Sequence, residues 1–250
     1  MTYKMVLSDS LLVVYENTNS GLVSRSKKYN RLMRKLALPY QTNKEQLIRA
    51  RNLGLNEIVC DRLLPALCQE ANRNDDLDSL VRTTSLKLIL TEEEDVELPY
   101  INYKSKFTNN ELSIFLKADE SRDSLIRYLQ FLCVNATKIT ICDNYFAHNW
   151  DNTNYLFRGV FPINTLNIEY VETHNELTVT RNSEKITQDF LTGIHSNWIV
   201  ARSNLYENSH DRYLRIEGPE GKVEVMISSG FEHIWKRKPK EITCVIREVS

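Results

Sequence analysis

Glycine, proline and long apolar runs are scarce in this chain of 250 residues, which contains 7 Gly and 6 Pro. So few chain-breaking residues argue against a long flexible linker and against a disordered chain. No run approaches the roughly 18 apolar residues of a membrane-spanning helix. The first residues lack the apolar core of a secretory signal, because Ser8, Asp9 and Ser10 interrupt them. We therefore expect a globular, cytoplasmic protein with no membrane span.

Cysteine is also scarce, and its pattern argues against a disulfide or zinc framework. The five cysteines are odd in number and scattered, no CxxC pair occurs, and each has apolar neighbours. Such cysteines are typical of small core residues in a reducing compartment. We expect them to be reduced and mostly buried, with no bound metal and no cofactor. They are Cys60, Cys68, Cys133, Cys142 and Cys244.

Neither sign of charge dominates, since 32 Lys and Arg stand against 33 Asp and Glu, for a net charge of −1. The chain therefore has no global basic field for nucleic acid, and any such binding needs a local patch. Hydrophobic residues make up 42% and charged residues 26%, proportions that are typical of a globular protein. A chain of this length forms one large domain or two small ones.

Residues 1–106 predict a small, helix-rich α/β region. An apolar run over 4–15 is typical of a strand or hairpin edge, and 86–90 predicts another strand. An asparagine is placed to cap a helix over 44–52, and a further helix is expected over about 56–72. We expect this N-terminal region to dock on a partner.

The segment from Arg25 to Leu38 predicts a basic amphipathic helix that ends before Pro39. Tyr29 and Leu32 belong to its apolar stripe, and six cations cover the rest. Two interpretations remain open: a solvated helix surface, or a docking face for an acidic partner, either nucleic acid or protein. For the docking face, the candidate binding residues are Arg25, Lys28, Arg31 and Lys35.

Residues 107–250 predict a mixed sheet flanked by helices, so the fold class of the chain is expected to be α/β. Runs of apolar and β-branched residues alternate here with segments of helical periodicity. The expected strands are 111–117, 138–146, 166–171, 197–202 and 243–249, and the expected helices are 121–132, capped by Ser121, and 185–191.

The stretch from His210 to Glu217 (HDRYLRIE) carries the most specific chemical signal. Side chains alternate along a strand, so His210 and Arg212 are expected on the same face. An imidazole beside a fixed positive charge is what attack on a phosphodiester needs. The ring attacks phosphorus or transfers a proton, and the cation offsets charge on the phosphoryl oxygens. A polar turn, Ser228-Ser229-Gly230, follows this stretch.

This stretch resembles the histidine-x-lysine-x4-aspartate motif of the phospholipase D superfamily. It is most similar to the His-Asp-Arg variant in the phospholipase D-like C-terminal domain of MIT-domain proteins. Arg212 stands where the lysine occurs and Glu217 where the aspartate occurs. The serine-glycine turn resembles the family's Gly-Ser segment, although no asparagine follows it.

The order of the expected strands and helices is also that of one phospholipase D-like half. The resemblance therefore covers about residues 108–250 and implies a phospholipase D-like domain over 107–250. It implies that His210, Arg212, Glu217 and Ser229 are catalytic, and that Arg212, Ser228 and Ser229 bind phosphate.

In that family two motif copies face each other, whereas this chain carries one copy. None of the other histidines begins a second His-x-Lys or His-x-Arg sequence; they are His148, His174, His195 and His233. The resemblance therefore implies that a complete two-histidine site needs a homodimer with a symmetric interface.

Three functional hypotheses follow. The first is a hydrolase, a metal-independent phosphodiesterase of nuclease type that works as a dimer. The second is a non-catalytic module that binds a phosphate-bearing ligand, a membrane headgroup or a protein partner. The third is a subunit of a larger bacterial complex, such as an antiviral phage-defence system. The arginine and glutamate replacements favour binding, because arginine is a good phosphate ligand but cannot give up a proton. We interpret the chain as nuclease-type, with the binding module as the alternative.

Overall fold

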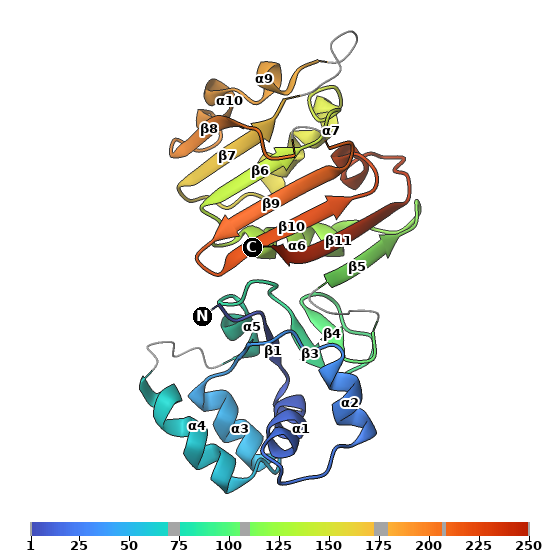
Figure 1. The fold of residues 1–250 in the computed structure, drawn as a ribbon. Coiled ribbons are helices and arrows are strands. Elements are labelled where there is room, and N and C mark those ends of the chain that lie inside the picture. The colour runs from blue at the N-terminus through green and yellow to red at the C-terminus, as the bar shows by residue number, and fades with distance from the viewer. Residues whose placement is uncertain (1, 70–75, 106–110, 173–179, 207–208, 250) are drawn as a thin grey trace. The chain divides into compact units, whose positions relative to one another are not determined.

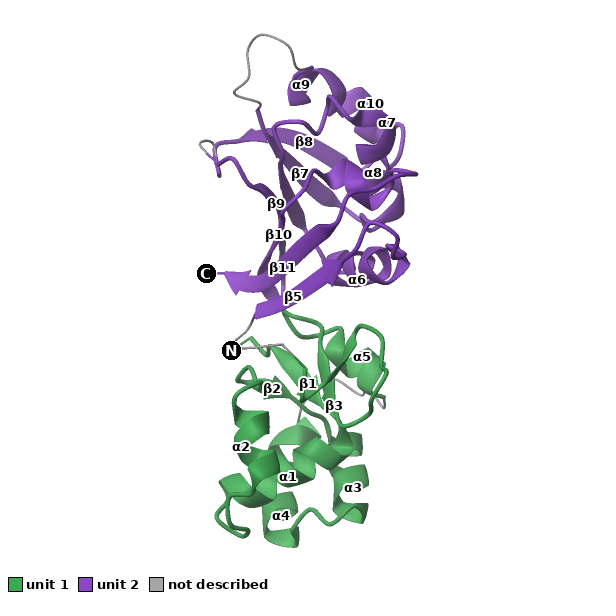
Figure 2. Cartoon of the chain, turned by 90° about the vertical axis from the view of Figure 1, so that its right-hand side faces the viewer, with its two compact units in different colours: residues 1–110 green, residues 111–250 purple. Residues whose placement is uncertain are grey.

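The computed structural model describes residues 2–69, 76–105, 111–172, 180–206 and 209–249. The chain divides into two compact units, Met1–Asn110 and Glu111–Ser250 (Figure 2). The first contains a four-stranded parallel sheet and the second a seven-stranded mixed sheet, each with its own helices. The expected α/β fold class, with mixed-sheet architecture in the C-terminal part, is confirmed.

The N-terminal unit is a small parallel sheet in the order β2-β1-β3-β4 (Figure 1). Its strands are β1 (Met5–Leu7), β2 (Tyr40–Gln41), β3 (Ile89–Thr91) and β4 (Tyr100–Asn102). Its helices are α1 (Asp9–Asn19), α2 (Lys27–Met33), α3 (Lys44–Asn52), α4 (Glu57–Gln69) and α5 (Leu77–Val81).

The expectation of one extended strand or hairpin edge over 4–15 is wrong. Strand β1 ends at Leu7 and helix α1 begins at Asp9. Leu11, Leu12 and Tyr15 are all buried, and their spacing places them on one face of a helix. A strand would have pointed Leu11 and Leu12 to opposite faces, so burial of the whole apolar set selects the helix.

The basic helix is shorter than expected and covers Lys27–Met33. It begins where the Ser26 side chain accepts a hydrogen bond from the Tyr29 N–H at 3.1 Å, so Arg25 lies before the helix. The expected α3 is confirmed over Lys44–Asn52, capped by Asn43 through the Gln46 N–H at 2.8 Å.

The C-terminal unit is a seven-stranded sheet in the order β5-β11-β10-β9-β6-β7-β8 (Figure 1). Strands β6, β7 and β8 are parallel, and β9, β10, β11 and β5 follow in an antiparallel block. The strands are β5 (Glu111–Leu116), β6 (Lys138–Cys142), β7 (Leu166–Val171), β8 (Trp198–Ser203), β9 (Arg212–Gly218), β10 (Gly221–Ile227) and β11 (Ile242–Val249). The helices are α6 (Asp123–Cys133), α7 (Trp150–Thr153), α8 (Tyr155–Gly159), α9 (Asn182–Lys185), α10 (Gln188–Thr192) and the 3-10 helix η1 (Phe231–Ile234).

Several boundaries in this unit differ from the expectation. The strand expected over 138–146 ends at Cys142. The helix expected over 185–191 is divided into α9 and α10, because Thr187 caps a new helix by accepting from the Phe190 N–H at 3.2 Å. Ser121 is not the capping residue of α6, which follows Arg122. Strand β10 and helix η1 were not anticipated.

The two faces of the seven-stranded sheet have different chemistry. Helices α6 to α10 pack on one face, as the side view of Figure 2 shows. On β9, Leu214 and Ile216 are buried. The alternate residue Arg215 stands opposite Glu224 on β10, and Glu217 stands opposite Lys222 on β10 and Lys138 on β6. On the face opposite the helices, residues of opposite charge therefore stand beside one another on neighbouring strands.

No described helix has the length and apolar character of a bilayer-spanning segment. Four of the five cysteines are buried, and Cys68 on α4 is exposed. Burial raises the pKa of Cys142 and of Cys244 to about 12, which keeps both thiols protonated and unreactive near neutral pH.

We expect native protein to show one fast-reacting thiol, because only Cys68 is accessible to a reagent. The measurement is titration with dithiobis(nitrobenzoate) before and after denaturation, and Cys68→Ser serves as the control that removes the fast phase. Several fast thiols in native protein, or a fast phase that persists in Cys68→Ser, would contradict the burial of the other four.

Candidate functional site

Three segments meet at one end of the seven-stranded sheet. Strand β9 begins at Arg212, which stands opposite Ile227 at the end of β10. Cys142, at the end of β6, stands opposite Tyr213. His210 lies two residues before β9 and is exposed. The turn after β10 and the loop after β6 therefore both begin beside the start of β9 (Figure 1).

The Arg212 side chain lies on the helix-covered face, because it alternates in step with the buried Leu214 and Ile216. Its Nε atom lies 3.9 Å from Oδ1 of Asp143, the residue that follows β6. Among the described residues, no side-chain hydrogen bond occupies the terminal nitrogens of this guanidinium. The guanidinium is therefore oriented on one side by an ion pair with Asp143 and keeps its donors for a ligand.

Asp143 is the buried centre of the cluster, with 1% of its surface exposed. Its Oδ1 accepts from the Tyr145 N–H at 2.9 Å, and its Oδ2 accepts from the Phe231 N–H at 3.2 Å. Burial raises the pKa of Asp143 to about 6; these two hydrogen bonds and Arg212 oppose the rise. The carboxyl group thus ties the loop after β6 to η1 and titrates close to neutral pH.

A second carboxylate, Glu232 on η1, adds to this rise in the pKa of Asp143. Its Oε1 lies 3.5 Å from Nε2 of His233 and 3.6 Å from Nζ of Lys236, and its buried Oε2 has no hydrogen-bond partner among the described residues. A methyl group on Gly230 would come within 1.9 Å of Oε2, so a larger residue at this position would force the Glu232 carboxylate to move.

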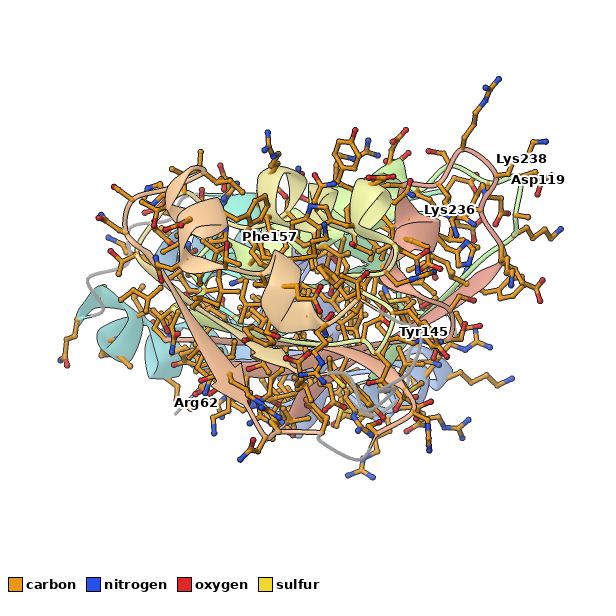
Figure 3. The ribbon with its side chains drawn as sticks, turned by 90° about the horizontal axis from the view of Figure 1, so that it is seen from above. Arg62, Asp119, Tyr145, Phe157, Lys236 and Lys238 are labelled. Carbon is orange, nitrogen blue, oxygen red and sulfur yellow. The ribbon has the colours of Figure 1, made fainter. Side chains whose placement is uncertain are left out.

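His233 is held in one tautomer. Its Nδ1 accepts from the Lys240 N–H at 3.1 Å, so the proton of the neutral ring is on Nε2 and faces Glu232. Burial lowers the pKa of His233, against the pull of Glu232. The segment after η1 adds further positive charge, and Figure 3 labels two of its lysines. Its cations are Lys236, Arg237, Lys238 and Lys240.

The serines of the turn after β10 lie at this end of the sheet, but their hydroxyls contact β11 and its approach. Ser228 Oγ accepts from the Thr243 N–H at 2.9 Å, and Ser229 donates to the Glu241 carbonyl at 3.2 Å. The hydroxyl proton of Ser229 is therefore already used. Ser228 keeps a proton that it can donate to a ligand.

Glu217 does not join the cluster, so the expected grouping of His210, Arg212, Glu217 and Ser229 is wrong for Glu217. Five residues of strand place Glu217 roughly 16 Å from Arg212, and the odd spacing puts it on the opposite face. There it pairs with Arg215 at 3.2 Å and Lys138 at 3.6 Å.

The four cations proposed for partner binding divide into two groups. Arg25 is exposed ahead of α2, and Lys28 is paired with Glu92 at 2.5 Å. Arg31 and Lys35 line a cavity of about 460 Å³ together with Arg34 and Lys104, two residues that the sequence interpretation had not selected.

Sequence reasoning also missed Asp143, Glu232 and His233. The available signal for Asp143 was a carboxylate directly after a buried apolar strand, since ligand sites in open α/β sheets lie outside the carboxyl ends of strands. Glu232 and His233 follow the serine-glycine turn closely, but no pattern of spacing marks them. Among the described residues, no group of three or more histidine, cysteine, aspartate and glutamate side chains is placed to hold a metal ion.

Comparison with known proteins identifies no family for this chain. No family model matches the chain, and no curated protein matches it either.

Proposed function

We propose that the C-terminal unit is a phospholipase D-like phosphodiesterase of nuclease type. The observation that supports it is the exposed His210 two residues before Arg212, whose guanidinium forms an ion pair with the buried Asp143 at 3.9 Å. An arginine fixed on one side and open on the other is suited to bind two oxygens of a phosphate. The basic segment after η1 adds favourable potential for the same anion.

In this proposal the His210 imidazole attacks phosphorus. An N–P bond forms, one P–O ester bond breaks, and the leaving oxygen takes a proton from a general acid. Water then attacks the phosphohistidine and releases the phosphate monoester. Arg212 offsets the charge that develops on the phosphoryl oxygens, and Asp143 fixes its orientation.

The acid in this scheme is His210 of a second copy of the chain, because the sequence carries one motif. A symmetric dimer places two equal histidines on opposite sides of one phosphate. The imidazole suits both roles because its ordinary pKa lies close to neutral pH. Such a dimer is also able to work as a subunit of a larger defence complex.

A second candidate is a non-catalytic module that binds a phosphate-bearing ligand, such as a membrane headgroup or a phosphorylated partner. Two observations favour it: Glu217 lies at the other end of β9, and the Ser229 hydroxyl is used by the Glu241 carbonyl. Binding needs Arg212 and the neighbouring cations but not the missing catalytic partners.

Arg212→Ala is expected to lower cleavage of labelled single- and double-stranded nucleic acid by about 10²–10³-fold, because it removes the main donor to the phosphoryl oxygens. Arg212→Lys is expected to keep part of the activity, since the charge remains while the forked geometry is lost. The assay is run with and without EDTA.

Arg158→Ala, at an exposed arginine of α8, is the matched control and should cleave like the wild type. Equal cleavage by Arg212→Ala and the wild type would refute the proposal. If the wild type cleaves nothing but binds a phosphate ester that Arg212→Ala does not bind, the binding module replaces the enzyme.

A further inference from the structure

The N-terminal unit contains a cavity of about 460 Å³ whose lining is entirely cationic. Arg31 is on α2, Arg34 is the C-cap of that helix, and Lys35 follows it. Lys104 comes from the turn after β4, far away in sequence. The fold therefore brings two separate basic segments to one hollow, with a volume in the range of ligand pockets, about 300–1,000 Å³.

The position of Lys104 is fixed by the turn that carries it. The Lys104 N–H donates to Asn102 Oδ1 at 2.7 Å. The Asn102 side-chain amide donates to the carbonyls of Glu92 and Glu93 at 3.0 and 2.7 Å. Lys104 is thus held beside the acidic loop after β3, so the hydrogen bonds of this turn fix its position at the cavity.

The cavity carries more positive charge than its neighbours neutralise. Lys104 pairs with Glu94 at 3.0 Å, whereas Glu92 is taken by Lys28 on the preceding turn of α2. Arg31 and Arg34 form no ion pair with any described residue, and their spacing on one side of the helix is repulsive. Arg31 also opposes the rise that Glu94 causes in the pKa of Lys104. A bound anion would relieve this repulsion.

We propose that this cavity binds linked phosphates, as on the backbone of a nucleic acid. The two guanidinium groups of Arg31 and Arg34 match phosphates spaced along a chain, and the ammonium groups of Lys35 and Lys104 add positive charge beside them. The lining includes no aromatic or apolar side chain, so the cavity recognises charge and not the bases. This site lies in the other unit from His210, and its binding does not depend on hydrolysis.

The test compares two variants of the full chain with equal changes in net charge. Both carry His210→Ala, so the probe is not consumed and failure of catalysis is separate from failure of this site. Arg34→Glu with Lys104→Glu reverses two cavity charges. Lys27→Glu with Lys44→Glu reverses two exposed cations at the starts of α2 and α3, where negative charge is favourable for a helix.

Affinity for a labelled single-stranded oligonucleotide is measured by anisotropy at several salt concentrations, with inorganic tripolyphosphate as competitor. The cavity variant should bind at least about tenfold more weakly, with a shallower salt dependence, while the control retains both. If tripolyphosphate displaces the oligonucleotide at a similar concentration of phosphate groups, the cavity still binds linked phosphates, but its ligand is a free polyphosphate. Equal losses of affinity in both variants would overturn the proposal. So would a His210→Ala protein, with no further change, that binds neither the oligonucleotide nor tripolyphosphate.

Discussion

His210→Ala is expected to abolish phosphodiester hydrolysis, with a loss on the order of 10⁴-fold. The imidazole is the proposed nucleophile, and His210 lies two residues before Arg212 in the chain. Because His210 is exposed and lies outside β9, its removal leaves no cavity. The free energy of unfolding should therefore change by less than about 0.5 kcal/mol.

The measurement is cleavage of labelled nucleic acid by wild type and variant, together with trapping of the acid-labile phosphohistidine. His195→Ala is the matched control, since His195 lies near the start of β8, at the other end of the sheet. The wild type and the control should both form the covalent intermediate, and EDTA should leave their rates unchanged. Cleavage that survives His210→Ala would exclude the proposed mechanism.

Elements with one clear periodicity could be predicted from the sequence. The segment Leu166–Val171 alternates and is bounded by polar residues, and it forms β7 over those residues. Helix α6 buries Leu125, Leu129 and Leu132, the apolar positions that have helical spacing. The prediction of one extended element over residues 4–15 was wrong because this segment contains a short buried strand followed directly by a buried helix. Both are apolar, so composition does not separate them.

The site was less predictable because its residues are far apart in the sequence and are brought together only by the pairing of strands. Sequence indicated Arg212, but its partner Asp143 directly follows β6, and the antiparallel pairing of β6 with β9, which ends at Cys142 and Tyr213, brings the two residues together. Glu217 could have been set aside, since an odd spacing from Arg212 along a strand puts the two side chains on opposite faces. The Glu232–His233 pair depends on a 3-10 helix, an element too short for periodicity to reveal.

Asp143→Asn is expected to change how stability depends on pH. The folded pKa of Asp143 is raised from 3.8 to about 6, so the folded state holds this proton more tightly than the unfolded state. The associated stabilisation is present below pH 3.8 and is lost as pH rises through about 6. At 1.36 kcal/mol per pKa unit, the wild type should lose up to about 3 kcal/mol relative to the variant between pH 4 and pH 7.5.

Asp143→Asn also has a destabilising effect that does not depend on pH, because the amide cannot accept from both the Tyr145 and Phe231 N–H groups. One buried donor is left without a partner, at about 1–3 kcal/mol. Urea unfolding at pH 4 and pH 7.5 should therefore show a deficit for Asp143→Asn that shrinks or reverses as pH rises. Asp151→Asn, at an exposed carboxylate of α7, is the control and should show no such trend. A deficit that grows with pH would mean that Arg212 outweighs burial and holds the pKa of Asp143 below its ordinary value. In either case the variant frees Arg212 from its anchor, so cleavage at pH 7.5 should fall even though His210 is unchanged.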